Sequence, residues 1–308
     1  MRRRLIQILQ WVFAAAVVIF VAVEVSRQWK LYSGRLRTLD IDWWDVGLAS
    51  LCVLVSYAIL IETWRRVLAV WDTTLAWGTA ARIWFASSLG KYIPGNVWAI
   101  AALGMMAKQQ GASGVAATGS SIIVNVLNLA AGLAVVLLCG AKLVPNIAVF
   151  AAGTVLVLAA VAIAPIVLPR IVAWIGKVTG KQVKLPQIPT ATIWMSVLGT
   201  TAAWLLYGLA FRLYAIALVG DAARPVVLPY IAVYTGAYIV GFITPIAPGG
   251  LGVREALLIK GLTLFGLMSG SDAAIVALTS RLWLTVLEVA PGLVALAATH
   301  ARTRTRHA

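Results

Sequence analysis

Six ionisable side chains fall inside long apolar stretches of the sequence, where lipid rather than water would surround them. A charge at the centre of a bilayer costs about 2.5–3.5 kcal/mol or more, so each needs a counter-charge or a function. Arg281 and Glu288 are seven residues apart and therefore share one face of a helix. Four cations against two carboxylates leave two positive charges in excess, which an anionic ligand such as a lipid phosphate would neutralise. The six residues are Lys91, Arg212, Arg254, Glu255, Arg281 and Glu288.

Two further apolar stretches, 79–107 and 229–267, are interrupted at their centres by proline and glycine. Neither half is long enough to cross a bilayer, so we expect both stretches to form re-entrant helical hairpins. Backbone N–H groups at the start of a half-helix are unpaired and carry partial positive charge, which favours an anion. Glycine at such a break lets a head group approach the backbone closely. The residues expected to bind it there are Pro94, Gly95 and Asn96 at the first break, and Gly249, Gly250 and Gly252 at the second.

Each ionisable residue also has a structural interpretation. Lys91 can cap the negative end of its half-helix, and Glu255 can serve as a helix-dipole partner or as the counter-ion of a neighbouring arginine. Arg212 lies near the end of its span and can extend its head group to the interface. Arg281 and Glu288 can equally form a structural pair, so the pattern alone leaves both interpretations open.

Other polar and aromatic residues are expected at the membrane surface. Glu62 precedes Arg65 and Arg66 by three and four residues, which predicts an interfacial ion pair. Tryptophans near the predicted span ends are expected to anchor the chain at the interface: Trp43, Trp44, Trp64, Trp71, Trp77, Trp174 and Trp194.

The composition excludes an ordinary soluble domain, because 62% of the 308 residues are hydrophobic and only 11% are charged. The formal net charge is +15, but the cations punctuate apolar runs, and no soluble basic domain remains to bind nucleic acid. Enzyme and cofactor motifs are missing, and Cys52 and Cys139 lie in apolar runs like small packing residues. Asp40, Asp42 and Asp45 offer a metal site to a membrane glycosyltransferase, but the short predicted loops argue against that class.

The elements that would position these residues are transmembrane helices, each about 20 apolar residues long. The first apolar run is too long for a signal peptide, so we expect a retained helix. Counting basic loops by the positive-inside rule places both termini in the cytoplasm, although the basic segment 26–45 then lies outside, against the rule. The chain is thus predicted to be an all-α polytopic membrane protein with about six spans: 5–25, 44–62, 114–139, 147–168, 192–219 and 273–299.

The two halves of this single membrane domain, 1–308, resemble each other. The run from Gly111 to Leu133 matches the run from Ser271 to Leu293 at an offset of 160 residues, and each follows a complete span and a broken hairpin. The predicted topology makes them inverted repeats, which place transporter sites where broken helices meet. The expected parts are a first helix and outer linker, 1–43; repeat 1, 44–140; a linking helix and basic loop, 147–191; repeat 2, 192–300; and a basic tail, 301–308.

Two segments resemble a known family. They are the run from Pro248 to Ala256, PGGLGVREA, and the run from Gly90 to Trp98, followed by Lys108. Both are similar to the flippase-like membrane domain of lysylphosphatidylglycerol synthases and their stand-alone relatives. The resemblance implies a polytopic domain that moves or hosts a lipid with a polar head group. The synthases carry a further soluble aminoacyl-transferase domain, which this chain, ending at Ala308, lacks, so we do not expect lysine transfer.

The function expected from these features is flippase-like, non-enzymatic transport of an anionic lipid across a bacterial or archaeal inner membrane. The cargo would be a polyprenyl-phosphate-linked sugar or an aminoacylated or other phospholipid. Lys91, Arg254 and Arg281 would bind the phosphate, and Glu255 or Glu288 would carry a coupling proton. The alternative is a non-transporting subunit that presents lipid to a glycosyltransferase or another lipid-modifying enzyme. A membrane glycosyltransferase is the third possibility.

Overall fold

The structure is a computed structural model that describes residues 39–92, 97–141, 188–244 and 250–305, with isolated residues between 148 and 174. All of the regular secondary structure in these ranges is helical, and none of the described residues is in a strand. Four helices are long: α2 (Trp43–Ala69), α5 (Gly114–Cys139), α7 (Thr190–Val219) and α10 (Gly270–Thr305). The others are shorter: α3 (Trp77–Ser88), η1 (Leu89–Tyr92), α4 (Val97–Gln109), η3 (Gly220–Ala222), α8 (Leu228–Ile243) and α9 (Val253–Leu264).

The four long helices contain segments that are long and apolar enough to cross a membrane. These segments are Trp43–Ala69, Ala116–Cys139, Thr190–Ala222 and Gly270–Val294, and they correspond to four of the six predicted spans. The predicted span 5–25 lies outside the described residues, and so does half of 147–168. The helix α10 continues to Thr305, so it takes in most of what the sequence suggested as a basic tail.

Both interrupted stretches consist of two short helices. The helices α3 and α4 have 12 and 13 residues, and α8 and α9 have 16 and 12, whereas a span needs about 20. The centres of the two interruptions, 93–96 and 245–249, lie outside the described residues.

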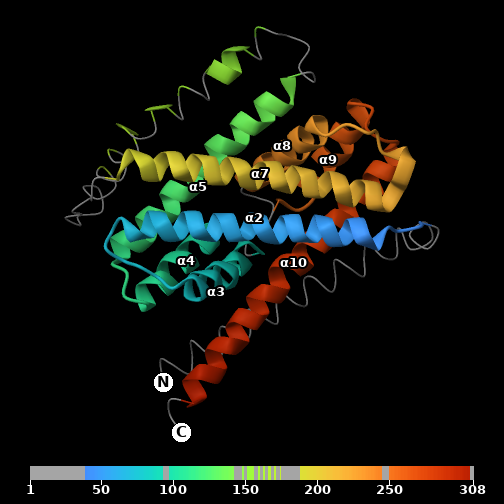
Figure 1. The fold of residues 1–308 in the computed structure, drawn as a ribbon. Helices are drawn as coiled ribbons and strands as arrows, with labels where there is room; N and C mark the ends of the chain where they lie inside the picture. Colours follow the sequence, from blue (N-terminus) through green and yellow to red (C-terminus); the bar gives the residue numbers. More distant parts are fainter. Residues whose placement is uncertain are drawn as a thin grey trace.

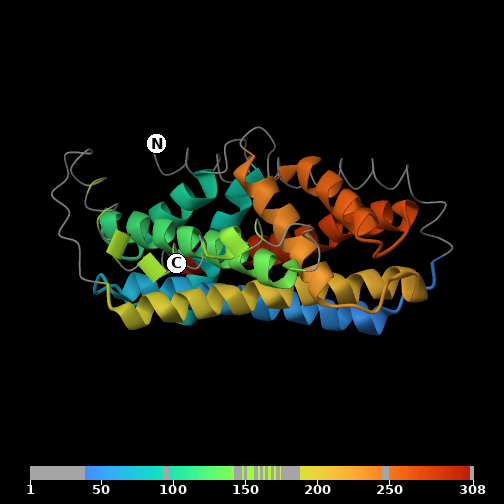
Figure 2. The same ribbon diagram turned by 90° about the horizontal axis from the view of Figure 1, so that it is seen from above.

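The helices α2 and α7 are antiparallel and form one layer of the molecule. The N–H of Asp42, before α2, donates to the carbonyl of Ala217 at 3.0 Å, and the Arg66 guanidinium near the end of α2 contacts Met195 Sδ near the start of α7 at 2.9 Å. Figure 2 shows the two helices side by side, with α3, α4 and α5 over one half of the layer and α8 and α9 over the other. In Figure 1, α5 and α10 run obliquely to this pair.

The packing of the helices has a regular pattern. The order of a long helix, two short helices and a second long helix occurs twice, as α2, α3, α4, α5 and as α7, α8, α9, α10. When each helix is exchanged for its counterpart, most contacts between these helices have a comparable equivalent: α5 packs on α8 as α10 packs on α3, and α2 packs on α5 as α7 packs on α10. The contact of α5 with α7 is an exception, because it is much more extensive than that of α10 with α2. The contact of α2 with α7 is its own counterpart in this exchange. The two halves therefore pack on each other largely through corresponding helices.

Two glycines allow the closest crossings between the halves. A Cβ at Gly132 of α5 would lie 2.8 Å from Ile239 Cδ1 of α8, and a Cβ at Gly292 of α10 would lie 2.9 Å from the Phe85 carbonyl oxygen of α3. The two glycines are 160 residues apart, which is the offset of the repeat expected from the sequence. Their contacts are therefore equivalent crossings of a long helix with the first short helix of the other half.

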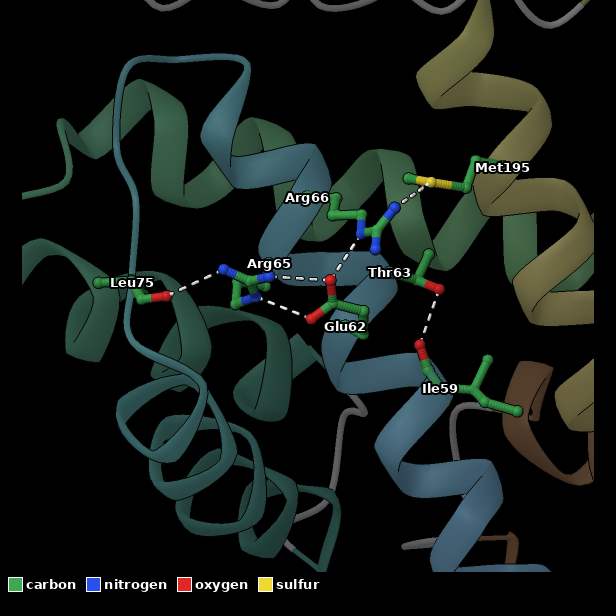
Figure 3. Close-up of polar contacts among 7 residues, drawn as sticks. All are labelled: Ile59, Glu62, Thr63, Arg65, Arg66, Leu75 and Met195. Carbon is green, nitrogen blue, oxygen red and sulfur yellow. Dashed lines mark hydrogen bonds and ion pairs between the residues drawn. The ribbon is translucent and has the colours of Figure 1, made fainter.

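A polar cluster secures the end of α2, as Figure 3 shows. Glu62 accepts hydrogen bonds from Arg65 at 2.8 Å and from Arg66 at 2.6 Å, which confirms the predicted ion pair. The Arg65 guanidinium also reaches the Leu75 carbonyl oxygen at 3.4 Å. The cluster therefore connects α2 to α7 and to the turn that leads into α3.

The structure corrects one expectation near the span ends. Trp64 was expected at the interface, but it is completely buried and packs beside Trp84 with 6.4 Å between ring centroids. Trp43 and Trp44, by contrast, are more than 70% exposed. Asp42, one of the aspartates considered for a metal, caps α2 by accepting from the Trp44 N–H at 2.9 Å, so helix capping accounts for it.

Candidate functional site

A cavity of about 190 Å³ lies between the two halves. Nine of the ten described helical elements line it, because α2, α3, η1, α4, α5, α7, α8, α9 and α10 each contribute at least one residue. Aromatic side chains form much of its wall: Tyr57, Trp84, Trp204, Tyr207 and Tyr238. The charged and amide residues that line it are Lys91, Asn125, Asn128, Arg254, Arg281 and Glu288. A largely apolar cavity with a few convergent polar groups is typical of a ligand site.

Arg254 lies in the first turn of α9 and is 8% exposed. Its guanidinium lies 5.1 Å from the ring centroid of Tyr234 and 5.1 Å from that of Tyr238, so cation–π contacts hold it in place. Its Nε and Nη2 atoms are buried and have no hydrogen-bond partner in the described part of the chain. A buried cation with unsatisfied donors is costly, and an anionic ligand would satisfy it.

Glu255, the next residue, is engaged on both sides. One carboxylate oxygen accepts from the Gly252 N–H at 2.7 Å and so caps the start of α9, and the other accepts from Arg281 of α10 at 2.5 Å. Both side chains of this ion pair are 7% exposed. The alternative interpretation of Glu255 as a helix-terminal and counter-ion residue therefore describes its contacts well, and Arg281 is the arginine it pairs with.

Lys91, at the end of η1, forms an ion pair with Glu288 of α10. Glu288 is 4% exposed, and both residues line the cavity. Since Arg281 and Glu288 share one face of α10, this helix binds both pairs of short helices. Arg281 binds Glu255 of α9, and Glu288 binds Lys91 of η1.

The site has a smaller charge excess than the sequence suggested. Arg212 does not line the cavity; its Nε donates to the Val226 carbonyl oxygen at 2.7 Å, which accounts for it structurally. The cations Lys91, Arg254 and Arg281 face the two carboxylates described above, which leaves one positive charge. Arg254 carries this excess, because no carboxylate of the described residues lies within ion-pair distance of it.

Gly250 and Gly252 of the second interruption shape the backbone and are not among the residues that line the cavity. Gly252 is the N-cap of α9 with φ 78°, and Gly250 has φ 72°, a left-handed conformation that glycine adopts readily. A Cβ at Gly250 would lie 3.0 Å from the backbone of Gly241 in α8, so the chain approaches α8 closely there. The other residues predicted for this site, Pro94, Gly95, Asn96 and Gly249, lie outside the described residues.

The sequence interpretation missed the neutral polar residues of the cavity, Asn125 and Asn128 of α5, and its aromatic wall. A signal for them existed. At the offset of 160, Val124, Asn125 and Asn128 match Leu284, Thr285 and Glu288, and all six line the cavity. The expected repeat, applied to the α10 positions predicted for the site, would have indicated these amides.

Comparison with known proteins agrees with this architecture. The family described as the lysylphosphatidylglycerol synthase TM region matches residues 5–292 of the 308. A search of curated proteins gave no match. The family match, with four helices able to span a membrane, indicates a multi-pass membrane protein with a lipid-related function.

Proposed function

Because this chain belongs to the family of the lysylphosphatidylglycerol synthase transmembrane region, we propose that it is a flippase-like transporter of an anionic lipid. The observation that carries the proposal is the state of the buried charges. Lys91 binds the cavity carboxylate Glu288 and Arg281 binds the neighbouring Glu255, whereas two buried donors of Arg254 have no hydrogen-bond partner among the described residues. A phosphate is a group that a guanidinium binds well, through two parallel charge-assisted hydrogen bonds.

We further propose that the two halves are inverted repeats and that α3–α4 and α8–α9 are re-entrant hairpins. The equivalent contacts of the two halves support this arrangement, and so do the equivalent residues that line the cavity. Inverted repeats with broken helices place a substrate site near the membrane midplane. Rocking of one half against the other would then expose the cavity to each side in turn.

The ion pair of Lys91 and Glu288 supplies a route to coupling in this proposal. Lys91 lies at the cavity, so a bound phosphate would compete with Glu288 for its ammonium group. Glu288 would then carry the coupling proton, as intramembrane carboxylates do in other transporters. Glu255 suits this role less, because capping of α9 and pairing with Arg281 engage both of its oxygens.

The test is a transport assay with purified protein in phosphatidylcholine vesicles. Phosphatidylglycerol labelled on its acyl chain with a fluorophore would be followed by chemical quenching of the outer leaflet. We expect exchange between the leaflets well above that of protein-free vesicles, and at least about a tenfold loss in Arg254→Gln, since one charge-assisted hydrogen bond is worth about 1.5–3 kcal/mol. The matched control is Arg66→Gln, which removes the same charge at an exposed position and should leave transport intact.

Two outcomes would contradict the proposal. Wild-type protein that binds the lipid but does not exchange it between leaflets would favour the lipid-presenting subunit, especially if a glycosyltransferase or another lipid-modifying enzyme co-purified with it. Equal transport by wild type and Arg254→Gln would remove Arg254 from the mechanism.

A further inference from the structure

The two long helices that face each other across the cavity present different chemistry at equivalent positions. On α10, Glu288 is charged and Arg281 lies two turns away on the same face. On α5, the position equivalent to Glu288 is Asn128 and the position equivalent to Thr285 is Asn125, so this wall is neutral. A symmetric ligand would not need this difference, which suggests that the ligand has a charged part and a neutral polar part.

The neutral wall has free hydrogen-bonding capacity. The Asn125 amide group donates to the Ser121 carbonyl oxygen at 2.8 Å and leaves its own oxygen as an acceptor. The Asn128 carboxamide makes no hydrogen bond to any residue in the described ranges, although its backbone carbonyl accepts from Trp204 Nε1 at 2.8 Å. A carboxamide both donates and accepts, and a hydroxyl does the same, whereas a phosphate only accepts. Hydroxyl groups therefore match this wall best.

The same site is poorly suited to an ammonium group. The carboxylates of Glu255 and Glu288 are already bound by cations, and these two residues together with Lys91, Arg254 and Arg281 carry one net positive charge in the described part of the chain. The faces of Tyr234 and Tyr238, which attract cations, are occupied by the Arg254 guanidinium. An aminoacylated, cationic head group would meet repulsion and find no free counter-charge among the described residues.

We propose that the head group handled by this cavity is a phosphodiester that bears a neutral polyhydroxyl group, a polyol or a sugar, and no ammonium. The inference rests on the proposed function, because it assigns the phosphate to Arg254. Asn128 and Asn125 bind the hydroxyls and determine specificity. The aromatic wall covers the apolar C–H faces of the polyol; in it Trp204 donates to the backbone carbonyl of Asn128 and lies beside Tyr207, with 6.2 Å between ring centroids.

The test compares lipids that share acyl chains and one phosphodiester charge but differ in the head group. Apparent dissociation constants come from the rise of the thermal midpoint with lipid concentration, measured on detergent-purified full-length protein. Phosphatidylethanol carries no hydroxyl, phosphatidylglycerol and phosphatidylinositol carry a polyol, and lysylphosphatidylglycerol adds ammonium groups. We expect at least one polyol lipid to bind roughly five- to tenfold more tightly than phosphatidylethanol, as one or two hydrogen bonds provide, and lysylphosphatidylglycerol to bind more weakly than phosphatidylglycerol.

Variants separate this inference from the function on which it rests. Asn128→Leu, which has the same branched shape but no polar atoms, should abolish the preference for polyol while phosphatidylethanol binds as before. Asn128→Ser, whose hydroxyl can still donate and accept a hydrogen bond, should retain part of the preference. Arg254→Gln should weaken all of the anionic lipids together. Equal binding of phosphatidylethanol and both polyol lipids to wild type, a preference that survives Asn128→Leu, or tighter binding of lysylphosphatidylglycerol would overturn the inference alone. Failure of wild type to bind any anionic lipid would overturn the proposed function as well.

Discussion

Lys91 and Glu288 are separated by 197 residues in the sequence, yet they form an ion pair at the cavity. The pair joins the first interruption, in one half of the molecule, to the last long helix of the other half. Arg281 on the same helix joins the second interruption through Glu255. The helix α10 therefore holds both pairs of short helices in place around Arg254. A movement of α10 would shift the partners of Lys91 and Glu255 together.

The ion pair at the first interruption predicts a coupled effect on stability. Lys91→Met should lower the free energy of unfolding by up to about 3 kcal/mol, the lower end of the range for buried pairs, because Lys91 is 27% exposed. The double variant Lys91→Met/Glu288→Leu should recover much of the loss, since no buried carboxylate then remains alone. Thermal midpoints of the two single variants and the double variant in detergent check this cycle. Losses that simply add would show that the two side chains act independently.

The second pair predicts a larger structural effect of Glu255. Glu255→Gln keeps an oxygen for the Gly252 N–H but leaves Arg281 without its carboxylate, which costs about 3–5 kcal/mol at a buried site. Glu255→Ala should cost about 1 kcal/mol more through the lost helix cap. Glu62→Gln is the matched control, since Glu62 pairs at the surface, where ion pairs contribute about 0–1 kcal/mol. A thermal midpoint of Glu255→Gln equal to that of Glu62→Gln would disprove the assigned role.

Much of this arrangement could be predicted from the sequence, because its signals are local. Apolar length predicted four helices that the structure contains, and the interruptions fall where proline and glycine predicted them. Ionisable residues in apolar runs identified Lys91, Arg254 and the α10 charges, since lipid tolerates few such residues without a reason.

What the sequence could not predict depends on packing between distant helices. Nothing local distinguishes Trp64, which is buried between α2 and α3, from the exposed Trp43. The partners of Arg281 and Glu288 lie on other elements, so spacing on α10 alone left a mutual pair equally plausible. Asn128 is an ordinary polar residue in a helix until the cavity shows that it faces the charged wall.

The close crossing at Gly292 predicts that even a methyl group there is harmful. The Cβ of Gly292→Ala would lie 2.9 Å from a backbone oxygen of α3, so the helices must separate, at a cost of about 1–3 kcal/mol. Gly47→Ala is the control, because nothing lies within 4 Å of a Cβ at Gly47, and alanine favours the helix by about 1 kcal/mol. The thermal midpoint should therefore fall in Gly292→Ala and stay level or rise in Gly47→Ala. If the thermal midpoints of both variants shifted in the same direction, the close crossing at Gly292 would not be the cause of the destabilisation.

The proposed topology predicts the sides on which two exposed positions lie. Thr74 lies in the turn after α2, and Asp221 lies in η3 after α7, at opposite ends of the α2–α7 layer. In a background with Cys52 and Cys139 replaced by alanine, a cysteine at 74 should react with an impermeant maleimide only from the cytoplasm, and a cysteine at 221 only from outside. Cysteines at 177–184 should also react only from the cytoplasm, as the cysteine at 74 does. Labelling of 74 and 221 from the same side would contradict the spanning arrangement, and labelling of 177–184 from outside would contradict the orientation.

The central claim is that Arg254 holds the phosphate of an anionic lipid inside the cavity, and native mass spectrometry of the purified protein measures this most directly. Wild type and the surface control Arg66→Gln should retain a bound phosphate-bearing lipid when the detergent is removed in the gas phase. In Arg254→Gln the bound fraction of that lipid should fall by about tenfold or more at the same protein concentration, because the buried cation is lost. The account would be contradicted if Arg254→Gln retained the same bound fraction as wild type. It would also be contradicted if the lipids bound to wild type were all uncharged.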